Sequence, residues 1–305
     1  MTGRWRRLGA LALDTRDAPW AVTHAALPVL DPIATDQWAI FFSLRGEDAR
    51  ARIGRATLTL TPVPRLSPLQ AVPVLDPGPL GAFDDSGVTS SCVVAQQGRK
   101  YLFFTGWSRG VTVPFYLAAS VAVSDDDGRT FRRVSVGPLL DRNGVDPYLT
   151  ASPFVLVEKS GWRMWYVSGT GWEQSPAGPR HLYHIRYAES QDGFAWVRKG
   201  IVCLDYSRPG EYAFSRPCVI HDDAGYHMWF ASRGSSYSIG YAASADGLRW
   251  ERHDEIAGLK PAQGGWDSQM VEYPFIFSGG GQRYMLYNGN DYGRTGVGLA
   301  VWEPS

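Results

Sequence analysis

Short runs of β-branched and aromatic residues alternate with clusters of Gly, Pro, Asn and Asp along the whole chain. Apolar runs bounded in this way by turn-forming residues are typical of β-strands. No long segment repeats its apolar residues at the 3.6-residue period of an amphipathic helix. The pattern therefore predicts an all-β protein.

One unit of this pattern recurs along the chain. In three copies an aspartate stands seven residues before a cysteine or proline, at residues 85–92, 146–153 and 267–274, and an aromatic strand with glycine follows. A fourth copy, residues 210–217, begins with glycine, and a degenerate fifth covers residues 20–46. Five strand-rich units at this spacing predict a single five-bladed β-propeller with a central funnel.

We expect one domain over residues 1–305, with no separate substrate or cofactor domain. The predicted blades are residues 20–61, 81–135, 144–200, 210–254 and 266–303, and the predicted inner strands lie near residues 24–30, 88–95, 149–157, 213–220 and 270–277. The last copy ends almost at the last residue, so strands from the N-terminal part should complete a blade with C-terminal strands. An open seam would leave unpaired strand edges.

A second repeat occupies the later part of three blades, at residues 124–131, 190–196 and 244–250. Its Ser-x-Asp-x-Gly pattern resembles the Asp-box hairpins of sialidases and related propellers. The Asp and Gly suit a tight turn, and the aromatic residue that follows packs the hairpin against its own blade. We interpret these segments as structural.

The chain has 30 basic and 30 acidic residues, and this zero net charge argues against nucleic-acid and anionic-membrane partners. The apolar run at residues 8–13 is too short for a signal peptide, so the sequence predicts a cytoplasmic protein. Its three cysteines lack metal-ligand spacing and are expected to be buried strand residues. We expect no cofactor and no metal site. The sequence does not define an oligomeric state.

Equivalent positions of a propeller repeat face one axis, so the repeated aspartates should converge there. At the level of blade pattern, residues 80–303 resemble the five-bladed glycosidases: the arabinanase/β-xylosidase and invertase-like group and the mannoside phosphorylases. Asp146-Pro147 is similar to their Asp-Pro strand start, and Glu272-Tyr273-Pro274 is similar to their Glu-x-Pro acid motif. The chain also resembles cytoplasmic propellers linked to polysaccharide or natural-product biosynthesis.

The resemblance implies three catalytic carboxylates in one pocket. Asp85 would be the base or nucleophile, Asp146 would orient the substrate and raise the pKa of the acid, and Glu272 would be the acid. The chain departs from the family where Ser215-Arg216-Pro217 replaces an expected Glu-x-Pro. An alternative stays open, because a residue repeated in every blade can instead hold the turn at each strand start.

Arginines follow equivalent aromatic strands and could bind an anionic group through paired hydrogen bonds. The predicted substrate-binding residues are His24, Arg45, Asp84, Arg109, Arg216, Arg233, Asp267, Asn288 and Asn290. We therefore expect a carbohydrate-active enzyme of glycosidase-like fold that acts by carboxylate acid/base chemistry on a small sugar, neutral or anionic, or on a glycosylated biosynthetic intermediate. The alternatives are transfer, elimination or isomerisation on the same fold, or a sugar-binding propeller without catalysis.

Overall fold

The structure is a computed structural model that describes residues 3–304. These residues form strands β1 to β21 and two helical turns of four residues each, α1 (Asp254–Ala257) and α2 (Asn290–Gly293). The predicted all-β fold is confirmed. None of the helices in the described part of the chain is long and apolar enough to cross a membrane.

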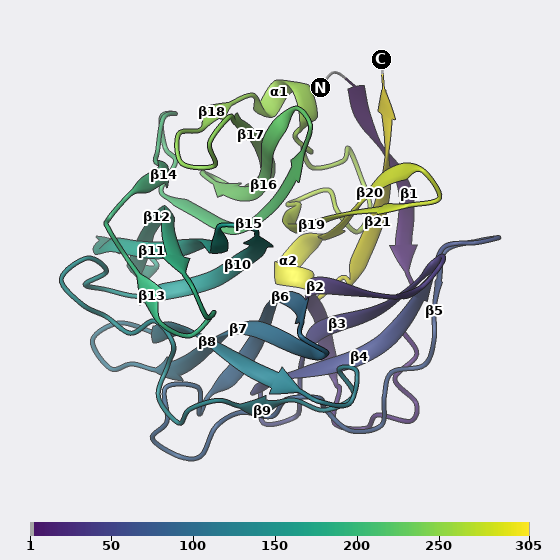
Figure 1. Cartoon of the computed structure of the whole chain (residues 1–305), viewed down its shortest axis with the longest axis horizontal. Helices are drawn as coiled ribbons and strands as arrows, with labels where there is room; N and C mark the ends of the chain where they lie inside the picture. Colours follow the sequence, from purple (N-terminus) through teal and green to yellow (C-terminus); the bar gives the residue numbers. More distant parts are fainter. Residues whose placement is uncertain (1–2, 305) are drawn as a thin grey trace.

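The strands form three hydrogen-bonded sheets, of 8, 9 and 4 strands, arranged around a common axis (Figure 1). Within the two larger sheets, single parallel contacts, Ala51 with Gly87 and Tyr183 with Ala213, join groups of antiparallel strands. The antiparallel pairing therefore divides the strands into five successive groups. The first two groups are β2 (Thr23–Ala34), β3 (Gln37–Arg45), β4 (Ala51–Thr59) and β5 (Arg65–Leu66), then β6 (Gly87–Gln96), β7 (Arg99–Arg109), β8 (Phe115–Ser124) and β9 (Arg132–Arg133). The third is β10 (Thr150–Glu158), β11 (Gly161–Ser175) and β12 (Gly178–Ser190), with β13 (Trp196–Val197) and β14 (Val202–Leu204) on β12.

The fourth group is β15 (Ala213–Asp222), β16 (Gly225–Arg233), β17 (Tyr237–Ser244) and β18 (Glu251–Arg252). The fifth group joins the two ends of the chain, because β1 (Gly3–Leu11) pairs antiparallel with β21 (Val297–Pro304) beside β20 (Gln282–Asn288) and β19 (Glu272–Gly279). This pairing confirms that an N-terminal strand completes the C-terminal group. In Figure 1 the two termini lie next to each other.

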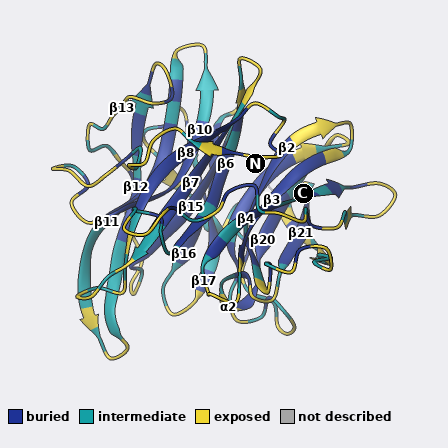
Figure 2. Cartoon of the chain, turned by 90° about the horizontal axis from the view of Figure 1, so that it is seen from below, coloured by how far each residue is buried: buried dark blue, intermediate teal, exposed yellow. Residues whose placement is uncertain are grey.

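The first strands of the five groups, β2, β6, β10, β15 and β19, surround the axis. Each contacts the next one, and β19 contacts β2, so the five strands close a ring. We interpret the five groups as propeller blades around this ring. Figure 2 shows that the buried residues gather on the strands and the exposed ones on the loops.

Each inner strand carries a bulge at the same place. The pairing with the second strand skips Leu27-Pro28, Ser152-Pro153, Arg216-Pro217 and Tyr273-Pro274 in four groups and Ser91 in β6. Proline, which has no N–H to donate, suits such an unpaired position. Cys92 and Cys218 come directly after the bulge, so they correspond to Phe154 and Phe275 rather than to the prolines.

The residue before each of these prolines has a positive φ, from 46° at Ser152 to 55° at Tyr273. Non-glycine residues rarely adopt this left-handed backbone conformation, and it persists only where surrounding packing enforces it. In these four inner strands the bulge therefore turns one side chain away from the regular alternation of its strand.

The three Asp-box segments form the expected hairpins, at the ends of β8, β12 and β17. In the hairpin after β12, Asp192 accepts hydrogen bonds from the backbone N–H groups of Phe194 and Ala195, each at 2.8 Å. Asp126 and Asp246 accept equivalent bonds in their own hairpins. These aspartates hold turns.

Candidate active site

A pocket of about 390 Å³ opens on the axis, at the ends where the inner strands begin. Every blade contributes to its wall. Its aromatic and ionisable lining residues are His24, Arg45, Trp107, Phe115, His181, Tyr183, Arg233, Tyr237, Tyr273 and Tyr292. No Asp or Glu lines it among residues 3–304, although two arginines do.

Glu272 lies at the start of β19 and is completely buried. Neither of its carboxyl oxygens has a hydrogen-bond partner within residues 3–304. Burial raises the pKa of Glu272 well above its usual value, and the charge of Asp291 adds to this, whereas Arg233 and the Tyr273 hydroxyl act in the opposite direction. The carboxyl group therefore favours its protonated form, because desolvation penalises the charged one.

We predicted that Asp146 would raise the pKa of Glu272 by like-charge repulsion. The structure gives a different cause, which is burial at the start of β19, next to Arg233 and Tyr273, two residues that line the pocket. In the other inner strands the residues that directly precede the bulge are Ala26, Ser90, Ala151 and Ser215. Glu272 is therefore the one carboxylate at this level of the described ring.

Asp146 is not available for catalysis in this structure. Its buried carboxylate accepts hydrogen bonds from Tyr166 at 2.9 Å, Ser168 at 2.6 Å and Arg198 at 2.9 Å, and Arg186 lies at 3.3 Å. Both oxygens are thus occupied by fixed donors. The structure thus places Asp146 outside the lining of the pocket, with Arg198, the residue that follows β13, on its carboxylate.

Asp85 also lies away from the lining of the pocket. Its two oxygens accept hydrogen bonds from the backbone N–H of Gly81 at 3.0 Å and from the Ser86 hydroxyl at 2.8 Å, so it holds the turn before β6. The predicted convergence of Asp85, Asp146 and Glu272 is therefore not what the structure shows.

The other repeated carboxylates are bound to arginines within their own blades. Arg133 donates to Asp84 at 2.6 Å, and Arg7 donates to Asp267 at 2.7 Å. In the fourth blade, where glycine replaces the aspartate, Glu211 takes the same role and pairs with Arg252 at 2.8 Å. These contacts support the alternative in which the repeated carboxylates have a structural role, and neither Asp84 nor Asp267 lines the pocket.

Of the four predicted arginines, only Arg45 and Arg233 line the pocket. The side chain of Arg109 is exposed at the end of β7. Arg216, predicted at the mouth, is completely buried, and its guanidinium donates to the backbone carbonyls of Ser90 at 2.5 Å and Pro28 at 2.9 Å. The bulge in β15 turns this side chain across the axis, so Arg216 ties β15 to β6 and β2.

The two predicted asparagines also have structural roles. Asn288 donates to the carbonyls of Ala25 and Gly296 and accepts from the N–H of Leu27, and Asn290 accepts from the N–H groups of Gln269 and Met270. They hold the loop around α2 against the neighbouring chain segments. His24 does line the pocket, as predicted.

Sequence reasoning missed the tyrosines and His181. The hydroxyls of Tyr183 and Tyr237 lie 3.1 Å apart, and the ring of His181 stacks on Tyr183 at 4.4 Å. Burial, together with the charges of Arg233 and Arg180, lowers the pKa of His181 to about 4, so this imidazole is neutral at neutral pH. His181, Tyr183 and Tyr237 come from the third strands β12 and β17, where the sequence contains ordinary packing aromatics. Tyr273 stands in the Glu-Tyr-Pro motif, and Tyr292 stands in the polar, glycine-rich segment of residues 287–296, so these two lie in segments that the sequence singles out.

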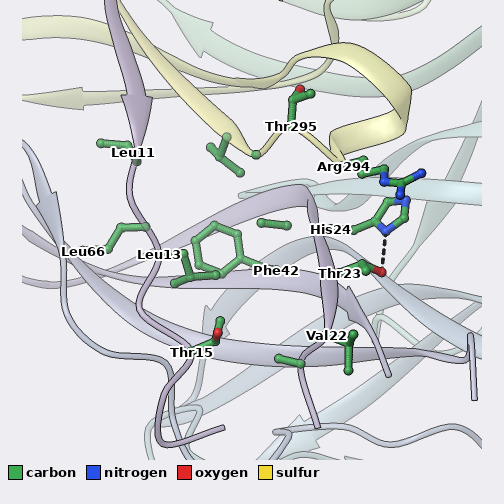
Figure 3. Close-up of a pocket in the computed structure, with 14 residues that line it drawn as sticks. Leu11, Leu13, Thr15, Val22, Thr23, His24, Phe42, Leu66, Arg294 and Thr295 are labelled. Atoms are coloured by element: carbon green, nitrogen blue, oxygen red, sulfur yellow. Dashed lines mark hydrogen bonds between the residues drawn. The ribbon is translucent and has the colours of Figure 1, made fainter. Parts of the chain in front are cut away.

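A second pocket, also of about 390 Å³, lies at the seam between β1 and β2 (Figure 3). Leu11, Leu13, Phe42 and Leu66 form its apolar part. His24 lines both pockets, and it stands at the polar rim near Arg294 in Figure 3. The two cavities are therefore neighbours across the start of β2.

No group of three or more His, Cys, Asp or Glu side chains within residues 3–304 is arranged to hold a metal ion.

Solved structures with a similar fold are glycoside hydrolases and related propellers. The chain superposes on a glycosyl hydrolase from Bacteroides ovatus with a TM-score of 0.74 and 14% identity, covering 100% of this chain and 95% of that one. A thermostable family-43 glycoside hydrolase gives 0.69, 14% identity and coverages of 92% and 89%. An endo-arabinase from Bacteroides thetaiotaomicron VPI-5482 gives 0.63, 14% identity and coverages of 94% and 96%. The protein thus has the glycoside hydrolase propeller fold.

The chain belongs to the same family as two Mycobacterium tuberculosis proteins. It is 40% identical over 299 residues to "Uncharacterized protein MT1551" of strain CDC 1551 / Oshkosh, covering 98% of this chain and 99% of that protein. It is 39% identical over 299 residues, with the same coverages, to "Uncharacterized protein Rv1502" of strain ATCC 25618 / H37Rv. No family model matches the chain.

Proposed function

We propose that this protein is a carbohydrate-active enzyme in which Glu272 donates a proton to a small sugar or a glycosylated biosynthetic intermediate bound in the central pocket. The observation that carries the proposal is the state of Glu272, a buried carboxyl group with no hydrogen-bond partner among the described residues and a raised pKa. Perturbed carboxylates in a concave site are frequent among catalytic acids. The glycoside hydrolase fold supports a sugar as the substrate.

The neighbours of Glu272 suit proton donation. Before transfer, burial keeps the carboxyl group neutral, and after transfer the positive charge of Arg233, which already lowers the pKa of Glu272, stabilises the carboxylate. Tyr237, Tyr273 and Tyr292 line the pocket beside it and offer aromatic faces and hydroxyls to a sugar ring.

The reaction class follows from the number of carboxylates. Hydrolysis by the usual glycosidase mechanisms needs a second carboxylate as base or nucleophile. The ring positions equivalent to Glu272 are alanine or serine, and Asp291, whose charge acts on Glu272, pairs with Arg294 at 3.5 Å. A reaction that needs one acid, such as transfer, elimination or isomerisation, is therefore the alternative that we place beside hydrolysis.

The test is the turnover of the Glu272→Gln variant on a panel of aryl glycosides and free sugars, followed by chromatography. Glutamine keeps the shape and removes the acidic proton, so we expect the rate to fall by about 100-fold to 10,000-fold. Asp85→Asn is the matched control, because both oxygens of Asp85 accept hydrogen bonds that hold the turn before β6, and it should keep the parent rate. Equal rates for Glu272→Gln and the parent, or binding without turnover in both, would contradict the proposal.

A further inference from the structure

We infer that the ligand of the central pocket is an acid sugar of about monosaccharide size, whose anionic group is bound by Arg233 and Arg45. This inference rests on the proposed function, since it takes the central pocket as the sugar site, and it deepens that function by naming the substrate class. A carboxylate and a phosphate share the required chemistry, which is negatively charged oxygen that accepts from a guanidinium.

Arg233 has aromatic neighbours but no anionic partner. Its guanidinium carbon lies 5.0 Å from the ring centre of Tyr237 and 5.5 Å from those of Tyr212 and Tyr292. Arg233 makes no ion pair with a carboxylate of residues 3–304. The carboxyl group of Glu272, on which the charge of Arg233 acts, favours its own neutral form because burial raises its pKa. The three rings hold the guanidinium in place and leave its charge uncompensated.

Arg216, which follows the pocket-lining residue Ser215 in β15, adds a second uncompensated charge. It is completely buried, its Nε has no partner, and within residues 3–304 it forms no ion pair. Burial lowers the pKa of Arg216 only to about 10, so the group stays charged at neutral pH. The residues that act on it electrostatically, Cys92, Cys218 and Tyr273, are themselves neutral there because burial raises their pKa values.

A buried unpaired cation is costly, and a negative charge nearby reduces that cost. The carboxylates that could have supplied this charge are used elsewhere: Asp84, Asp146, Glu211 and Asp267 are each bound to an arginine of their own blade. Asp291, at the rim, is paired with Arg294. Within residues 3–304, Arg45, Arg216 and Arg233 thus have no paired carboxylate. An anionic ligand would supply the missing negative charge.

The two histidines of the pocket respond to the same positive field. Arg233 and Arg180 help burial to lower the pKa of His181 to about 4. Burial and then Arg45 and Arg294 lower the pKa of His24, against an opposing contribution from Asp291. Neutral histidines beside charged arginines can accept or donate hydrogen bonds to sugar hydroxyls while the arginines hold the anion.

The size of the pocket limits the ligand. About 390 Å³ is at the lower end of the range of small-molecule sites, and it suits one sugar ring with its acidic substituent. Arg45 stands at the mouth with an exposed side chain, whereas Arg233 lies deeper among the tyrosines. An anion bound between them would contact the guanidinium of Arg233, which is packed against tyrosine rings, and the exposed guanidinium of Arg45.

The test compares the binding of glucuronate, galacturonate, glucose 6-phosphate, glucose, galactose and inorganic sulfate by calorimetry and thermal shift. We expect at least one acid sugar to bind about tenfold or more tightly than its neutral parent, with an affinity that falls as salt rises. Tighter binding of a uronate or of glucose 6-phosphate would each support the inference. Which of the two binds more tightly tells whether the anionic group is a carboxylate or a phosphate. A panel in which neither sulfate nor any acid sugar exceeds the neutral sugars would overturn it.

Variants locate the anion. Arg233→Gln should weaken acid-sugar binding about tenfold or more, and Arg233→Lys should recover only part of it, since lysine lacks the planar fork. Arg109→Gln is the control, because Arg109 is an exposed arginine that does not line the pocket. An Arg233→Gln variant that folds and binds the acid sugar like the parent would overturn the inference.

The two proposals fail in different ways. If acid sugars bind but Glu272→Gln changes no rate, the proposed proton donation fails and the anion site stands. If a neutral glycoside is turned over in a Glu272-dependent way and acid sugars gain nothing, the anion site fails and the proposed function stands.

Discussion

Arg198, which directly follows β13 and lies 52 residues further along the chain, donates a hydrogen bond to Asp146 at 2.9 Å. The same relationship joins Arg133 to Asp84, and it recurs in the fourth and fifth blades with different partners. In four of the five groups a carboxylate just before the inner strand, at or near the repeated position, is therefore one half of a buried ion pair. It anchors the blades around the pocket, while the chemistry of the site lies in residues that do not repeat.

Asp146→Asn should destabilise the protein by about 3–5 kcal/mol in urea unfolding, because it leaves Arg186 and Arg198 buried without a counter-charge. Any loss of activity should follow the loss of folded protein. Asp85→Asn is the matched control and should stay within about 0.5 kcal/mol of the parent, since Asp85 is only partly buried at a turn. A stable Asp146→Asn protein with a specific loss of rate would show that Asp146 acts in catalysis after all.

Phe104→Tyr should stabilise the protein by about 1 kcal/mol. Tyr166 and Tyr287 donate to Asp146 and Asp267 from the equivalent place, but Phe104 cannot donate, and one oxygen of Asp84 is buried without a partner among residues 3–304. Tyr166→Phe is the converse change and should cost about 1.5–3 kcal/mol. Thermal and urea unfolding measure both. Destabilisation by Phe104→Tyr would mean that the added hydroxyl does not reach Asp84.

Glu272→Gln should become more stable than the parent as pH rises above about 4.5, the ordinary pKa of glutamate. The folded-state pKa is raised, so the folded protein binds more protons than the unfolded chain, and stability falls with rising pH until the folded pKa is passed. Glutamine cannot ionise, so the variant does not lose stability in this way. The loss in the parent's free energy of unfolding amounts to about 1.4 kcal/mol for each unit by which the pKa of Glu272 in the folded protein exceeds that in the unfolded chain.

Urea unfolding of both proteins at a series of pH values measures this difference. Below about pH 4 the two stability curves should run parallel, because glutamate is then protonated in both states. A constant difference at every pH would mean that the pKa of Glu272 is not raised by folding.

The three cysteines should not react with a thiol reagent in the native protein at neutral pH. Cys92, Cys203 and Cys218 are buried, and burial raises the pKa of each thiol to about 12, so the reactive thiolate is scarce and shielded. Labelling with iodoacetamide, followed by mass spectrometry, should detect all three only after unfolding. Fast native labelling of Cys218 would contradict the close packing of the inner ring.

The sequence by itself determined the elements and their order. Strand-length apolar runs, turn residues and the five-fold recurrence are local properties, and they placed the inner strands within a few residues of β2, β6, β10, β15 and β19. The Asp-box hairpins were predictable for the same reason, because Asp192 bonds to residues two and three positions away. The Glu-Tyr-Pro motif also led to Glu272.

The tertiary structure alone decided what each charged residue does. Nothing in the spacing around Asp146 or Arg216 shows that one meets an arginine 52 residues away or that the other reaches a carbonyl 126 residues away. Ionisable side chains take their roles from burial and from partners, and both arise when distant strands pack around the axis. Two similar sequence signals can therefore become a structural ion pair in one place and a buried, protonated acid in another, according to the neighbours that folding supplies.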